Sequence, residues 1–250
     1  MSILSGAEGF ISHLIELRDR LLKAIAALFI VFFTLFYWAQ DIYSLLAAPL
    51  IEALPEGSTM IAIEVAAPFF VPIKVTLFAS FVVALPVVLY QVWAFIAPGL
   101  YTHEKRLVVP LIATSTILFL VGCLFAYLVV FPTVFHFVAA FTPEGVEMNT
   151  DIQKYFDFVL TLFLAFGLAF ETPIAVVILT RMGIVSIETL KESRPYIIVG
   201  AFVIAAIFTP PDVISQLLLA FPIWILYEIG LFIAGILEKK AEQREKLGED

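Results

Sequence analysis

Long apolar segments separated by short polar connections are the feature that most restricts how this chain can fold. A helix needs about 20 mostly apolar residues to cross about 30 Å of hydrocarbon, and several segments reach that length. Of the 250 residues, 62% are hydrophobic and only 14% are charged, which is too little charge to cover a soluble domain of this size. The sequence therefore predicts a protein that folds in lipid.

The apolar segments predict an all-α integral membrane protein with a single domain of six transmembrane helices. The expected spans cover residues 21–39, 72–96, 107–131, 155–180, 196–208 and 213–237. The fifth span, at about 20 Å as a helix, is too short for an unperturbed bilayer, and only Thr209-Pro210-Pro211-Asp212 separates it from the sixth. We expect helices five and six to be short antiparallel neighbours, with one helix broken at the two prolines as the alternative.

Basic residues indicate which side of the membrane each loop occupies, because cytoplasmic loops are enriched in Lys and Arg. With six helices, twelve of the 14 basic residues lie on the same side as both termini: Arg18, Arg20, Lys23, Lys105, Arg106, Arg181, Lys191, Arg194, Lys239, Lys240, Arg244 and Lys246. The opposite loops are mainly acidic. Both termini are therefore expected in the cytoplasm, and residues 238–250 are expected to form a disordered tail.

The first apolar segment follows three basic residues, as the apolar part of a cleavable signal peptide does. It is rich in aromatic side chains, however, and no small-residue cleavage site follows it. We therefore expect a retained first helix.

The residue inventory argues against several classes of function. A net charge of −8 disfavours nucleic acid as a partner. The single cysteine, Cys123, and three scattered histidines offer no metal-ligand spacing, so no metal is expected. Neither a GxSxG elbow nor a Gly-rich phosphate loop is present, so we expect no catalytic residues, no cofactor and no enzymatic activity.

Acidic residues inside apolar segments are the first candidates for function. Glu171, in Phe170-Glu171-Thr172-Pro173, lies within the fourth expected span, where a charge costs several kcal/mol unless it is paired, protonated or facing water. It is interpreted either as a structural hydrogen-bonding group or as a polar patch for a partner helix or substrate. Glu228 in the sixth span allows the same two interpretations.

Two further carboxylates lie at the cytoplasmic side. Glu16 belongs to the segment SHLIELRDRL (residues 12–21), where Arg20 follows it at helical spacing, and Glu104 belongs to the loop APGLYTHEKRL (residues 97–107). An interfacial helix with an ordinary i,i+4 ion pair explains the first segment without any function. Alternatively, two carboxylates at a bilayer surface suit two guanidinium groups, because arginine binds carboxylate bidentately.

These segments resemble the TatC family, the membrane receptors of the twin-arginine protein translocase. The resemblance covers nearly the whole chain. It rests on HLIELRDRL (13–21), APLIEALPEGSTMIAIEVAAPFFVPIK (48–74), YQVWAFIAPGLYTHEKRLVVP (90–110), LVVFP (128–132), AFGLAFETPIAV (165–176), MGI (182–184) and RPYIIVGAFVIAAIFTPPDVISQLLLAFPIWILYEIG (194–230). Lys105 stands where relatives often have Arg, which is a mild departure.

The resemblance implies roles for named residues. The residues implied to bind the signal peptide at the cytoplasmic face are Glu16, Arg18, Phe95, His103, Glu104, Lys105 and Arg106. Glu171 matches the family's intramembrane glutamate on the concave face of the bundle, associated with partner contact, and Glu228 is a second candidate there. Structural or assembly roles are expected for Pro49, Pro86 and Asp212.

The resemblance also implies partners and location. We expect an oligomeric complex in the bacterial inner membrane with the single-span proteins TatA and TatB, driven by the proton-motive force and engaging twin-arginine signal peptides of folded cargo. An ion-coupled small-solute transporter with Glu171 as proton carrier is the alternative. Such transporters usually have inverted repeats, and the proline-broken segments do not recur in matching halves.

Overall fold

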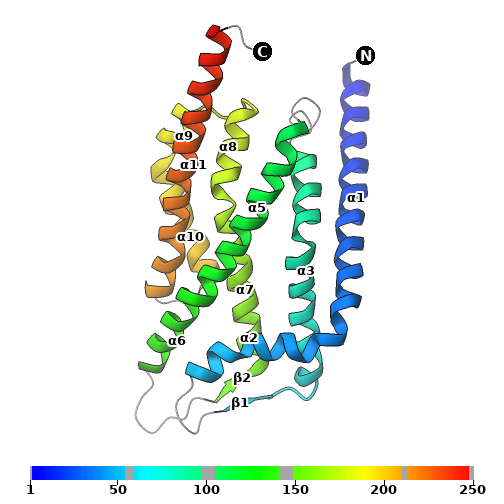
Figure 1. The fold of residues 1–250 in the computed structure, drawn as a ribbon, viewed down its shortest axis with the longest axis vertical. Coiled ribbons are helices and arrows are strands. Elements are labelled where there is room, and N and C mark those ends of the chain that lie inside the picture. Colours follow the sequence, from blue (N-terminus) through cyan, green and yellow to red (C-terminus); the bar gives the residue numbers. More distant parts are fainter. Residues whose placement is uncertain (1, 54–58, 97–104, 141–148, 210–212, 248–250) are drawn as a thin grey trace. The chain divides into compact units, whose positions relative to one another are not determined.

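The computed structural model describes residues 2–53, 59–96, 105–140, 149–209 and 213–247 (Figure 1). Within these ranges, five helical stretches are long and apolar enough to cross a membrane, and one further apolar helix is shorter. The predicted class, an all-α multi-pass membrane protein, is confirmed. The chain divides into two compact units, residues 1–45 with 68–116 and residues 46–67 with 117–250.

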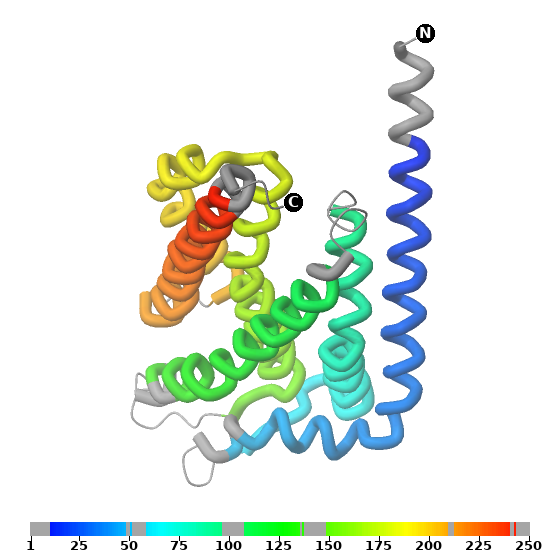
Figure 2. Tube along the Cα trace, turned by 45° about the horizontal axis from the view of Figure 1, so that its top comes forward, coloured from blue at the N-terminus to red at the C-terminus, as the bar shows by residue number. Residues whose placement is uncertain are grey.

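The first unit is built on two long helices. Helix α1 covers Ser2–Leu35, and helix α3 covers Ala67–Ile96. They run side by side in Figures 1 and 2, and the beginning of α5 (Lys105–Phe125) belongs to the same unit. A 3-10 turn, η1 (Phe36–Trp38), leads from α1 into α2 (Ala39–Ala53), which the boundary between the units crosses.

The second unit contains the remaining helices. After α5 come a π-helical turn, η2 (Ala126–Val130), and α6 (Phe131–Ala140). The later helices are α7 (Ile152–Phe170), α8 (Thr172–Arg181), α9 (Ile187–Glu192), α10 (Arg194–Phe208) and α11 (Val213–Leu247). Helix α11 packs against both α8 and α10 (Figure 2). The largest fully buried side chains of this unit are Phe119, Phe131, Phe156 and Phe166.

The lengths of the last two helices correct one sequence prediction. Helix α10 has 15 residues and is short, as expected. Helix α11 has 35 residues, and its apolar stretch Val213–Lys240 alone is long enough to span. The expectation that helix six is short and that a disordered tail begins at residue 238 therefore does not hold. Residues 238–247 consist of Glu, Lys, Ala, Gln, Arg and Leu, which favour helix even where they are too polar for lipid.

Two short strands, absent from the sequence prediction, join the connection before α3 to the connection before α7. β1 (Met60–Ile61) pairs in parallel with β2 (Thr150–Asp151), with Met60 opposite Thr150. The Asp151 side chain caps α7 by accepting from the backbone N–H of Gln153, and it also accepts from the N–H of Ile63, each at 3.4 Å. A second long-range bond runs from the Tyr155 hydroxyl to the carbonyl of Leu46, at 3.1 Å.

The turn between α8 and α9 is fixed by a glycine. Gly183 has φ +68°, in the left-handed region. Its N–H donates to the carbonyl of Thr180, and the N–H of Ile184 donates to that of Leu179, the two bonds of a Schellman motif. Ser186 then caps α9 by accepting from the N–H of Thr189. The Schellman motif therefore ends α8, and the Ser186 cap begins α9.

Close helix packing in the second unit depends on Gly122 of α5. A Cβ at this position would lie 2.5 Å from the carbonyl oxygen of Phe166 in α7, and that atom is backbone, so it cannot rotate away. Glycine therefore permits α5 and α7 to approach almost backbone to backbone. By contrast, a Cβ at Gly235 in α11 would meet nothing within 4 Å.

We expect Gly122→Ala to lower the free energy of unfolding by about 1–3 kcal/mol, because overpacking forces a rigid backbone apart. Gly235→Ala is the matched control, and it should be neutral or stabilising since alanine favours helix. Thermal unfolding of both variants in the same detergent measures the difference. Equal midpoints for the two variants would contradict the close packing of α5 and α7.

Candidate functional site

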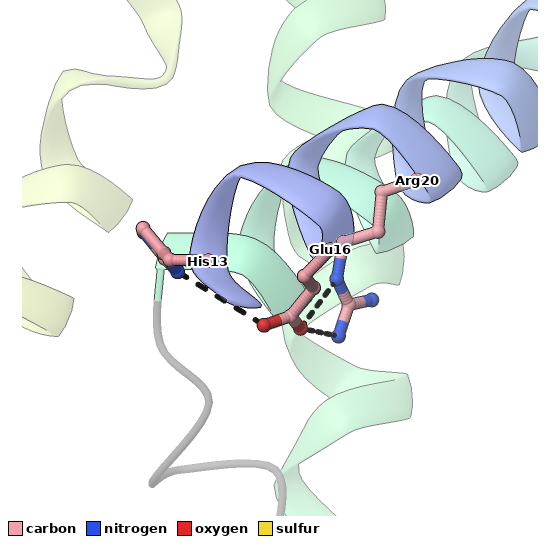
Figure 3. Close-up of polar contacts among 3 residues, drawn as sticks. All are labelled: His13, Glu16 and Arg20. Carbon is pink, nitrogen blue, oxygen red and sulfur yellow. Dashed lines mark hydrogen bonds and ion pairs between the residues drawn. The ribbon is translucent and has the colours of Figure 1, made fainter. Parts of the chain in front are cut away.

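Three side chains on α1 form the polar cluster drawn in Figure 3. Arg20 donates from Nε at 2.9 Å and from Nη2 at 2.6 Å, and both bonds go to Oε1 of Glu16. The second oxygen, Oε2, lies 4.0 Å from Nδ1 of His13, which is beyond hydrogen-bond distance. The cluster follows from helical spacing, since His13 and Arg20 lie three residues before and four residues after Glu16.

The cluster continues onto α3 through an aromatic contact. The His13 ring stacks on Phe95, with 4.3 Å between ring centroids and an interplanar angle of 14°. Two residues earlier on α3, Trp93 is buried and donates from its indole N–H to the hydroxyl of Ser115 in α5, at 3.0 Å. This bond ties α3 to α5 near the connection that carries residues 97–104. Phe95 therefore contacts the charged cluster through His13.

The other residues predicted to bind the peptide are described only in part. Arg18 is exposed and pairs with its neighbour Asp19 at 2.7 Å, so it contributes to a separate ion pair on α1. His103 and Glu104 lie outside the described residues. Lys105 and Arg106 form the first turn of α5, and their side chains lie outside the described part. The pairing of Glu16 with Glu104 stays a prediction.

Glu171 lies at a break between two helices in the second unit. Pro173 has no N–H for the carbonyl of Ala169, four residues earlier, and the Thr172 hydroxyl donates to that carbonyl instead, at 2.6 Å. Helix α7 ends at Phe170 and α8 starts at Thr172, so the expected span 155–180 consists of two helices joined at Glu171. The Glu171 side chain is only 8% exposed. A carboxyl group is thus held inside the unit at a local break of the helix.

Glu228 is engaged within the same unit. Arg194 at the start of α10 donates from Nε to Oε1 and from Nη2 to Oε2 of Glu228, each at 2.7 Å, so both carboxylate oxygens are used. The sequence analysis missed Arg194 as its partner, although a signal existed. Arg194 precedes Pro210 by 16 residues and Glu228 follows Pro211 by 17, so an antiparallel pair places the two at one level.

A buried tyrosine lies beside this ion pair. Tyr227 is 2% exposed and donates from its hydroxyl to the carbonyl of Leu190 in α9, at 2.7 Å. It belongs to an apolar cluster with Val176, Ile187, Leu190, Leu231 and Ala234. The ion pair and this cluster together hold α9, α10 and α11 in a fixed arrangement, which indicates a structural role for Glu228.

We expect Tyr227→Phe to destabilise the protein by about 1–2 kcal/mol, because it removes a buried hydrogen bond and leaves a carbonyl with less bonding. Tyr196→Phe is the matched control, since Tyr196 is 78% exposed. Thermal unfolding in detergent should show a lower midpoint for the first variant alone. A similar midpoint for both would mean that the Tyr227 hydroxyl contributes nothing.

The remaining predicted positions have limited descriptions. Pro86 lies inside α3 and is exposed, so its ring faces away from the first unit's core. Pro49 belongs to α2, but its side chain lies outside the described part, and Asp212 lies outside the described residues. Among the described residues, no group of three or more His, Cys, Asp or Glu side chains is placed to hold a metal ion.

Comparison with known proteins identifies relatives along almost the entire chain. The family model of the Sec-independent protein translocase protein (TatC) matches residues 12–222. The Sec-independent protein translocase protein TatC of Azotobacter chroococcum mcd 1 is 57% identical over 232 residues, covering 93% of this chain and 91% of the relative. That of Escherichia coli (strain K12) is 56% identical over 236 residues, covering 94% and 92%.

Solved structures agree with the sequence comparisons. A crystal structure of the twin arginine translocase receptor TatC matches with a TM-score of 0.78 and 42% identity, covering 90% of this chain and 98% of that one. A second crystal structure, of the same receptor in DDM, matches with a TM-score of 0.79 and 40% identity, covering 89% and 99%. The similarity therefore extends over nearly the full length of both proteins.

Proposed function

This chain belongs to the TatC family of Sec-independent protein translocase proteins, and from that membership we propose that it is the receptor that binds twin-arginine signal peptides through Glu16. The translocase interpretation of the sequence is confirmed, and the transporter alternative gains no support from the comparisons. The observation that carries the peptide-binding role is the Glu16 carboxylate, which is partly exposed and has one oxygen not bonded to Arg20.

The chemistry of the proposed contact favours arginine. A guanidinium presents several N–H donors in a plane, so it can bind a carboxylate oxygen with defined geometry, whereas a lysine ammonium is a compact and strongly hydrated point charge. Oε2 of Glu16 lies on the side of His13 (Figure 3), and the His13 ring stacks on Phe95. An arginine of the peptide would reach this oxygen beside an apolar surface, where charge-assisted bonds are stronger than in water.

A second carboxylate is required for a second arginine, and we assign that role to Glu104. The family resemblance supports it, together with the sequence position of Glu104 just before α5. In the same proposal, Arg18, His103, Lys105 and Arg106 complete the site as groups that contact the rest of the signal peptide. The bond from Trp93 to Ser115 joins α3 to α5, the helices on either side of this connection.

We expect Glu16→Gln to weaken binding of a twin-arginine peptide by about tenfold, because a charge-assisted hydrogen bond becomes a neutral one. Glu192→Gln is the matched control: it removes an exposed carboxylate from α9, far along the sequence from the proposed site. Fluorescence anisotropy with a labelled twin-arginine peptide and the full chain in nanodiscs measures both affinities. Equal affinities for the two variants would refute the proposed role of Glu16.

Glu171 is proposed to serve partner recruitment. The family resemblance supports this role, and Glu171 lies at the break between α7 and α8, within the apolar stretch Ile152–Arg181. The single-span proteins TatA and TatB are the proposed partners, in an oligomeric complex of the bacterial inner membrane with both termini of this chain in the cytoplasm. Energy is proposed to come from the proton-motive force.

We expect Glu171→Ala to reduce recovery of TatB in pull-downs at least about threefold, because the polar contact for the partner is lost. Binding of the twin-arginine peptide should stay within about twofold of the unmodified protein. Glu171→Gln is the matched variant: it keeps hydrogen-bonding capacity and should retain most of the TatB. Loss of peptide binding together with unchanged TatB recovery would contradict this assignment.

The shortness of α10 supports a further part of the proposal. At 15 residues and about 1.5 Å per residue, α10 is roughly 22 Å long, which is less than the usual hydrocarbon thickness. A short helix favours local thinning of the bilayer, which would ease passage of a folded cargo. Because α11 is long, this effect is assigned to α10 alone.

A further inference from the structure

Arg20 bonds only one of the two carboxylate oxygens of Glu16. Both of its short bonds go to Oε1, and among the described residues Oε2 accepts no hydrogen bond. The ion pair between Arg194 and Glu228 differs, because there each carboxylate oxygen receives its own bond. Each oxygen of Glu228 thus accepts a bond from Arg194, whereas Arg20 bonds only one oxygen of Glu16 and leaves the other able to accept from a group outside the described residues.

The two bonds from Arg20 to a single oxygen fix the orientation of the Glu16 carboxylate. Two donors from one planar guanidinium hold Oε1, and the Arg20 side chain is largely buried, with 23% of it exposed. Oε2 is consequently directed toward His13, whose ring stacks on Phe95. A glutamate side chain that is free to rotate would lose conformational entropy on binding a peptide, and a glutamate already held does not.

The geometry points to Arg20 as a positioning residue that holds Oε1 of Glu16 so that Oε2 is presented to one arginine of the signal peptide. This inference rests on the proposed function and adds a residue to it. Glu16 then has one oxygen available and binds a single arginine, so the other arginine of the peptide must bind a different carboxylate. Charge alone predicts the opposite effect of removing the Arg20 guanidinium on peptide affinity. With one cation fewer at the site, a cationic peptide should bind more strongly.

We expect Arg20→Gln to weaken binding of the twin-arginine peptide by about three- to tenfold, the range expected when one long side chain must be ordered on binding. Arg20→Lys should recover part of the affinity, since an ammonium four residues from Glu16 still reaches Oε1. Lys23→Gln is the matched control: it removes the same charge from an exposed position on α1 and should not weaken binding. The assay is peptide anisotropy with the full chain in nanodiscs.

A double-mutant cycle separates positioning from general damage. In the Glu16→Gln background, Arg20→Gln should have no further effect on affinity, because Arg20 acts through the Glu16 carboxylate. Stronger binding by Arg20→Gln would identify Arg20 as a competitor of the peptide, and additive losses would identify a structural effect. Either result overturns the inference. If Glu16→Gln alone leaves the affinity unchanged, the proposed function itself fails.

Discussion

The absence of water in hydrocarbon is the constraint on which this structure depends. A backbone carbonyl exposed to lipid costs several kcal/mol, so each break in a transmembrane helix needs a local substitute donor. At the break between α7 and α8 the Thr172 hydroxyl supplies it, bonding the Ala169 carbonyl that Pro173 cannot serve. This substitution makes an irregular turn tolerable inside the second unit, and that turn carries the buried Glu171.

The same constraint explains how much of the fold the sequence predicts. Apolar length, prolines and loop charge are properties of single segments, so the helical class and the short α10 could be predicted. The break at Glu171 was not predicted, because the span 155–180 was taken as one helix. Helix α11 was misjudged because a polar composition was taken for disorder, although its residues favour helix. The β1–β2 pairing was missed because a two-residue ladder between segments about 90 positions apart has no local signature.

The candidate site was predictable in its residues and not in its geometry. Glu16 and Arg20 are four apart, so their pairing was expected from helical spacing alone. The stacking of His13 on Phe95 joins positions 82 apart and depends on how α1 and α3 pack. Which oxygen of Glu16 is bonded depends on side-chain rotamers, and sequence patterns carry no information about rotamers.

The small ladder between β1 and β2 has a consequence for how the chain is made. Residues 60–61 leave the ribosome long before residues 150–151, so β1 has no pairing partner until β2 has been synthesised. The same holds for the Leu46 carbonyl, which waits for the Tyr155 hydroxyl. Because contacts distant in sequence form late, both contacts form only after the chain has reached residue 155. The connection before α3 and the start of α7 are thus joined only after the intervening helices have been made.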